Sequence, residues 1–192
     1  MGTGYLEDSD LIRILRLVKN VGGDVAEVGV FKASLFHRLA TWAHRYGVMA
    51  HAFDSFQGMA KPGPYDLEEK YPEGKLSVGG VKGFVHIMEE FSIPLDWYIL
   101  WPGFIPDCFI DTEKLRFRFV YIDLDHYQPT IEAIEWVLGR LLPGAVLGFD
   151  DWFPSTTIGP SKAIRTLIGW DIIPPWYEND NNQIFFRRRD EQ

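Results

Sequence analysis

The chain has 192 residues, which is enough for one domain with a substantial core and short for two. A net charge of −8 argues against the basic face of a nucleic-acid-binding protein, and no apolar run approaches the roughly 20 residues that span a bilayer. The single cysteine, Cys108, excludes an intrachain disulfide and fits a reducing compartment, and the N-terminus lacks a secretory leader pattern. We therefore expect one domain over residues 1–192 that is cytoplasmic and binds neither nucleic acid nor membrane.

The first predicted elements alternate between helices and strands. Residues 1–22 contain a helix whose apolar stripe is formed by Leu11, Ile12, Ile14, Leu15 and Val18. A buried strand over 24–30, a helix over 33–47 and a second strand over 48–56 follow. This order is typical of a parallel sheet with helical crossovers.

Residues 57–76 interrupt the alternation, because they hold three prolines and three glycines and show no periodicity. Loops of this length in a compact domain are usually functional or disordered, so we interpret the segment as a lid. Alternation then resumes, with helices over 77–92, 129–141 and about 161–168, and strands over 96–103, 118–123 and 145–150.

Two further strands, over 170–175 and 182–189, are separated by only a few residues, too few for a parallel crossover. They should form an antiparallel hairpin. The predicted fold class is therefore α/β: a doubly wound, mostly parallel sheet of seven strands that ends in a C-terminal antiparallel hairpin.

Ligands of such sheets bind at the carboxyl ends of the strands. The first strand ends in "AEVGVFKAS", with Glu27 and Gly29, and the second ends in Asp54, where nucleotide-binding folds hold ribose hydroxyls. Bulky residues replace the later glycines of a dinucleotide fingerprint, which favours an adenosine ligand without phosphates. The alternative is an ordinary strand-to-helix turn.

Carboxylates also follow two later strands, in "YIDLDHY" and "GFDDW". Asp123, Asp150 and Asp151 should converge across neighbouring strand ends, and such an all-oxygen set suits a hard cation such as Mg²⁺ or Ca²⁺. The alternative for Asp150 and Asp151 is a helix cap with a solvated neighbour. Asp125 faces either the ligand that binds at the end of the first strand or the following helix. His126 is either a base or a structural hydrogen-bonding residue.

Several blocks resemble, in this order along the chain, those of the macrocin-O-methyltransferase (TylF-type) family. They are "AEVGVFKAS", "HAFDSFQGM", "GKLSVGGV", "WPGFIPDCF", "YIDLDHYQPTIEAIEWVLGRLLPGAVLGFDDW" and "GPSKAI", and they cover roughly residues 24–165. The resemblance implies a Rossmann-like methyltransferase fold and an enzyme that uses S-adenosylmethionine and Mg²⁺, or another divalent cation. It further implies methylation of a hydroxyl of a small molecule, a sugar or phenol of natural-product type.

The resemblance also implies roles for individual residues. Glu27 and Gly29 would bind the methionine part of the cofactor, and Asp54 its ribose. Ser55 and Phe56 would flank the adenosine, and we place Asp125 in the cofactor site as well. The metal ligands would be Asp123, Asp150 and Asp151. Asp123 or His126 would take the proton of the acceptor hydroxyl.

Three features depart from the family pattern: a short segment before the first strand, Ala33 or Ser34 in place of a second glycine, and His126 where an apolar residue is usual. Two alternatives therefore stay open, a non-catalytic S-adenosylmethionine-binding domain and a nucleotide-cofactor oxidoreductase. Four tryptophans near strand ends line an acceptor cleft or belong to the core: Trp97, Trp101, Trp152 and Trp176. A homodimer is common among similar proteins.

Overall fold

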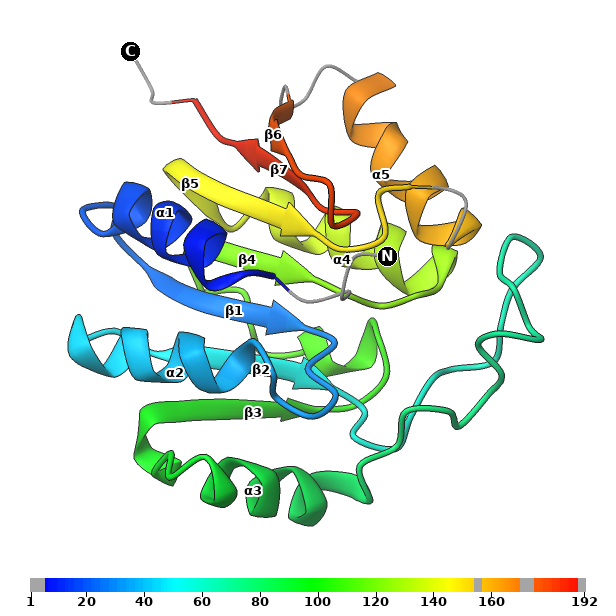
Figure 1. The fold of residues 1–192 in the computed structure, drawn as a ribbon, viewed down its shortest axis with the longest axis horizontal. Coiled ribbons are helices and arrows are strands. Elements are labelled where there is room, and N and C mark those ends of the chain that lie inside the picture. Colours follow the sequence, from blue (N-terminus) through cyan, green and yellow to red (C-terminus); the bar gives the residue numbers. More distant parts are fainter. Residues whose placement is uncertain (1–5, 154–156, 170–174, 190–192) are drawn as a thin grey trace.

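The computed structural model describes residues 6–153, 157–169 and 175–189, in which a seven-stranded sheet lies between two layers of helices (Figure 1). The strands are β1 (Asp24–Val28), β2 (Ala50–Asp54), β3 (Tyr98–Pro102), β4 (Phe117–Ile122), β5 (Leu141–Phe149), β6 (Pro175–Glu178) and β7 (Ile184–Arg187). The helices are α1 (Asp8–Val18), α2 (Phe36–Arg45), α3 (Gly80–Glu90), α4 (Tyr127–Leu138) and α5 (Ile158–Gly169), with short 3₁₀ turns η1 (Leu95–Trp97) and η2 (Asp107–Phe109).

The strand order is β3-β2-β1-β4-β5-β7-β6. The first five of these strands are parallel, and β7 is antiparallel to both β5 and β6. This arrangement confirms the predicted doubly wound sheet and its antiparallel end. The direction of winding reverses between β1 and β4, so the crevice beyond the ends of these two strands is where a ligand is expected.

Two apolar cores lie on opposite faces of the sheet. Helices α1, α2 and α3 cover one face, where Phe36 and Phe84 pack with their ring centroids 5.9 Å apart. Helices α4 and α5 cover the other face, where Phe109 stacks on Trp136 at 4.1 Å. The stripe predicted for the first helix is buried except at Ile12, which is 50% exposed. No helix in the described ranges is long and apolar enough to cross a bilayer.

The penultimate strand differs from its predicted position. Most of the predicted strand over 170–175 lies outside the described residues, and β6 runs through part of the segment that we expected to be a turn. Local pairing explains the position, because Tyr177 stacks on Phe185 of β7 and its hydroxyl donates a hydrogen bond to Asp10 of α1. The hairpin therefore closes over a shorter connection than predicted.

Candidate active site

The ends of β1 and β4 meet at Gly29 and Asp123. The Asp123 N–H donates a hydrogen bond to the Val28 carbonyl at 2.9 Å, which extends the β1–β4 pairing past both strands. Gly29 has a φ of +85°, and a Cβ atom at this position would lie 1.8 Å from the Asp123 carbonyl oxygen. Only glycine combines this backbone conformation with so close an approach. The turn after β1 therefore depends on the glycine that the sequence singled out.

Asp54, at the end of β2, fixes that same turn. Its carboxylate accepts hydrogen bonds from the N–H groups of Val30 at 2.8 Å, Phe31 at 3.3 Å and Phe56 at 2.7 Å. A carboxylate offers about four acceptor positions, so roughly one is left for a ribose hydroxyl. Asp54 thus shapes the turn in addition to any contact that it makes with a ligand.

A cavity of about 310 Å³ lies beyond these strand ends. Six of the predicted site residues line it: Gly29, Asp54, Ser55, Asp123, Asp125 and His126. The remaining wall comes from Phe31, residues 58–61, Leu76, residues 103–105, Leu124, and Gln128, Pro129 and Glu132 of α4. The four tryptophans near strand ends all lie in the described part of the chain, and none of them is among the lining residues. The interpretation that they line an acceptor cleft therefore finds no support at this cavity.

Phe56 and Glu27 do not line the cavity. Phe56 is buried in the core, with its ring centroid 4.8 Å from that of Phe84. Glu27 is buried as well, and its Oε2 has no hydrogen-bond partner among the described residues. Burial and the negative charge of Asp54 raise the pKa of Glu27 well above its usual value, against the opposing effect of Arg38. Such a carboxylate fits a cationic ligand group, because a cation would offset its desolvation.

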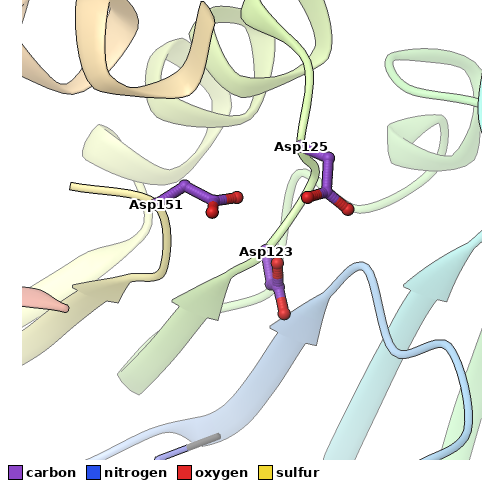
Figure 2. A group of neighbouring side chains, drawn as sticks. All are labelled: Asp123, Asp125 and Asp151. Atoms are coloured by element: carbon purple, nitrogen blue, oxygen red, sulfur yellow. The ribbon is translucent and has the colours of Figure 1, made fainter. Parts of the chain in front are cut away.

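Three carboxylates gather at the ends of β4 and β5. Asp123, Asp125 and Asp151 each place one oxygen within 4.8 Å of the others, and Figure 2 shows their side chains around a shared space. Asp125 and Asp151 have φ values of +57° and +61°, a conformation that costs energy in non-glycine residues and is common at functional sites. Asp151 is buried, and its Oδ2 has no partner in the described part of the chain.

Asp150 is not a member of this group of three. Its Oδ1 accepts a hydrogen bond from the Tyr121 hydroxyl at 3.2 Å. Both residues follow the end of β5, and the positive φ of Asp151 turns the chain there, so Asp150 and Asp151 have different neighbours. The structure thus brings together Asp123 and Asp151, as the sequence suggested, and adds Asp125 where the sequence suggested Asp150.

The acidic cluster is electrostatically unfavourable without a counter-charge. Burial, followed by repulsion from neighbouring carboxylates, raises the pKa of Asp123 and of Asp151 well above the usual range. Burial also raises the pKa of Asp125, although hydrogen bonding by Tyr71 opposes the shift. Protons or a cation can offset the repulsion. The donor set contains only carboxylate oxygens and includes an unpartnered one, so it fits a hard divalent cation.

His126 and Cys108 are the remaining sequence candidates. His126 is 2% exposed and lies 3.0 Å from the Tyr71 carbonyl through Nε2, which therefore carries the proton and donates it. This contact is the structural role that the sequence left open, although the ring also lines the cavity. Cys108 is buried, and burial raises the pKa of its thiol to about 12, so it is not a thiolate nucleophile at neutral pH.

We expect the metal-free protein to become less stable as the pH rises from about 4 to about 7. Burial raises the pKa of Asp150 to about 7 from an ordinary value of 3.8. The folded state then binds this proton more tightly than the unfolded state, so the stabilisation is complete below the lower value and is lost through the higher one. Urea unfolding in EDTA, compared between wild type and Asp150→Asn, measures the effect. Parallel pH profiles for the two proteins would contradict it.

Sequence reasoning missed part of the cavity wall. Residues 103–105 lie in the block "WPGFIPDCF", but their apolar side chains carried no chemical signal. Gln128 and Glu132 are one helical turn apart on α4, a spacing that would have placed them on one face of the predicted helix. Tyr71 lies within the predicted lid, where the absence of periodicity gave no basis for choosing one residue over another.

Comparisons with known proteins agree with this fold. No protein-family model matches the chain. Two solved methyltransferase structures share its fold: NovP, an O-methyltransferase, with a TM-score of 0.76 and 16% identity, and CalS11, the calicheamicin methyltransferase, with 0.72 and 21%. The alignments cover 93% of this chain and 79% of NovP, and 95% of this chain and 80% of CalS11.

A curated relative shows the family. It is the 8-demethyl-8-(2,3-dimethoxy-α-L-rhamnosyl)-tetracenomycin-C 4′-O-methyltransferase of Streptomyces olivaceus, which is 30% identical over an alignment of 182 residues. The alignment covers 89% of this chain and 68% of the relative. The turn at Gly29 and the carboxylates at the ends of β4 and β5 belong to the blocks that carry the resemblance in sequence. The chain therefore belongs to the TylF-type O-methyltransferases, a family of class I S-adenosylmethionine-dependent enzymes.

Proposed function

We propose that this enzyme transfers the methyl group of S-adenosylmethionine to a hydroxyl of a sugar in a natural product, with the assistance of Mg²⁺. The observation that carries the proposal is the placement of three converging carboxylates beside a cavity at the switch point of the sheet. The sugar is suggested by the relative, which is named for methylation of a rhamnosyl group. A phenol hydroxyl is the second acceptor class that the family resemblance implies.

The proposal assigns the cofactor to the cavity between the turn after β1 and the end of β2. The turn at Gly29 would accept the methionine part against its backbone, and the buried, unpartnered carboxylate of Glu27, two residues before this turn, would attract the amino group through its negative charge. The remaining acceptor position of Asp54 and the hydroxyl of Ser55, which also lines the cavity, would contact the adenosine. The sulfonium is itself a good leaving group, so the protein mainly has to position the reactants and exclude water.

The acidic cluster would hold the cation through Asp123, Asp125 and Asp151. A bound Mg²⁺ supplies Lewis acidity, which lowers the pKa of an acceptor hydroxyl and fixes its orientation. Of the two predicted bases, Asp123 both lines the cavity and belongs to the acidic cluster, and its carboxylate has a second oxygen besides the one that would hold the cation. His126 donates its Nε2–H to the Tyr71 carbonyl and keeps Nδ1 as its one proton acceptor. The proposal assigns proton removal to Asp123 and keeps His126 as the second candidate.

Titration calorimetry with S-adenosylhomocysteine, followed by methyl-transfer assays on rhamnosylated acceptors with and without Mg²⁺, tests the proposal. We expect micromolar binding and transfer that EDTA abolishes. Absence of binding would refute the cofactor assignment, and binding of NAD in its place would favour an oxidoreductase. Binding without transfer to any sugar or phenol acceptor would favour a non-catalytic domain, and transfer that persists in EDTA would remove the cation from the proposal.

A further inference from the structure

Loop 57–76 is attached to the start of α4 through Asp66. The Asp66 Oδ1 accepts a hydrogen bond from the N–H of Tyr127, the first residue of α4, at 2.7 Å. Its Oδ2 accepts from the Gly63 N–H within the loop at 2.8 Å. The N-cap residue of α4, His126, makes no side-chain cap of its own. A carboxylate 61 positions earlier in the chain therefore caps this helix.

The start of α5 meets the same carboxylate. Gly159 is the second residue of α5, and a Cβ atom there would lie 2.1 Å from the Asp66 Oδ1 and 2.8 Å from the Tyr127 nitrogen. A side chain at position 159 would therefore displace Asp66 and would also crowd the backbone at the start of α4. The positive ends of two helices converge on one negative charge, an arrangement that stabilises the charge and holds the loop between the helices.

Other contacts of the loop lead to the acidic cluster. The Tyr71 carbonyl accepts the Nε2–H of His126 at 3.0 Å, and the Tyr71 hydroxyl is hydrogen-bonded to Asp125. The ring of Tyr65 packs edge-to-face on that of Tyr127, with centroids 4.9 Å apart. Residues 58–61 of the same loop line the cavity. The loop thus forms one wall of the cavity and also reaches one of the three clustered carboxylates.

We propose that Asp66 is a positioning residue for methyl transfer, which latches loop 57–76 onto α4 and α5 and thereby seats Tyr71 against Asp125. The inference rests on the proposed function and assigns a role to a loop residue that touches neither the cavity nor the acidic cluster. In the latched state the loop separates the reactants from water and fixes the orientation of Asp125. When the contacts of Asp66 break, the loop opens to water and Asp125 loses its fixed orientation at the same time.

Four variants of the full chain test the latch. Asp66→Ala removes both acceptor oxygens, and Asp66→Asn keeps one oxygen for two N–H donors. Gly159→Ala displaces the carboxylate from the other side and leaves the loop sequence intact, but its Cβ also crowds the Tyr127 nitrogen of α4. Glu69→Ala is the matched control, because it removes an equal charge from an exposed position of the same loop.

The first readout is native-state trypsin cleavage after Lys70 and Lys75. Loss of a helix cap favours local opening by about fivefold to thirtyfold, and cleavage should accelerate accordingly in Asp66→Ala and Gly159→Ala. Asp66→Asn should be intermediate, and Glu69→Ala should match wild type. The second readout is turnover, where we expect kcat to fall by about ten- to a hundredfold in the open variants while affinity for S-adenosylhomocysteine changes by less than about threefold.

The two readouts test separate parts of the proposal, the latch itself and its role in positioning Asp125. Wild-type cleavage rates in both Asp66→Ala and Gly159→Ala would overturn the latch. Faster cleavage with unchanged kcat would overturn its role in positioning. Cleavage needs no acceptor, so it tests the latch even if wild type transfers no methyl group and the proposed function fails. If Asp66→Ala does not fold, Asp66→Asn still decides, because it keeps the shape of the side chain and one acceptor oxygen.

Discussion

Replacing Asp123 by asparagine should lower kcat for methyl transfer by about a thousandfold. Asp123 is the one member of the acidic cluster that is both a predicted cation ligand and the assigned base, and it lines the cavity. Loss of several kcal/mol of transition-state stabilisation, at about 1.4 kcal/mol per tenfold, accounts for this magnitude. Steady-state kinetics at saturating Mg²⁺ and cofactor give the change. The fold should persist, because the variant removes a buried charge that repels its neighbours.

Asp150→Asn is the matched control for this experiment. It makes the same chemical change at a neighbouring strand end, but Asp150 is outside the group of three carboxylates. We expect kcat to fall by no more than about tenfold, since the Tyr121 hydroxyl can still donate to the amide oxygen. A loss as large as that of Asp123→Asn would instead show that Asp150, as the sequence suggested, holds the cation. Unchanged turnover in Asp123→Asn would remove both roles from Asp123.

Gly29→Ala should destabilise the protein by about 3 kcal/mol and weaken S-adenosylhomocysteine binding by at least about tenfold. The Cβ atom would lie 1.8 Å from the Asp123 carbonyl oxygen, so the backbone at the ends of β1 and β4 must separate. The estimate combines about 1 kcal/mol for the left-handed backbone with about 2 kcal/mol for the forced displacement. Urea unfolding and titration calorimetry measure the two effects.

Gly47→Ala separates the two contributions. Gly47 also has a positive φ, +67°, but a Cβ atom there would meet nothing within 4 Å. This variant should therefore show the conformational cost of about 1 kcal/mol without any change in cofactor binding. Equal destabilisation by Gly47→Ala and Gly29→Ala would mean that the close approach at Asp123 contributes nothing.

Much of the fold could be predicted because periodicity and connection length decide it. The apolar stripe of α1 and the short connection before β7 are each encoded by residues that are close together in the sequence. Both features are present in the structure. The turn at Gly29 was predictable for a similar reason, since a glycine directly after a buried strand is typical of a tight turn with a positive φ. The start of α3 was less accurate, because Gly79 and Gly80 both adopt positive φ and delay the helix.

The membership of the acidic cluster could not be predicted from spacing. Asp125 joins it through a positive φ, and whether a non-glycine residue adopts that conformation depends on the surrounding fold. The same holds for Phe56, which also has a positive φ. Its ring is buried against Phe84 and does not lie beside the cavity. The partner of Asp66 lies 61 residues away, and no local pattern encodes such a contact.

The position of β7 between β5 and β6 has a consequence for synthesis on the ribosome. β6 is made before β7 but pairs with the sheet only through it among the described strands, so neither strand can take its place until residues 184–187 have emerged. Until then the edge of β5 presents unpaired backbone groups beside apolar residues such as Val146 and Leu147, the kind of edge on which other chains can pair. The nascent chain is thus prone to aggregate after β5 has been synthesised and before β7 has been synthesised.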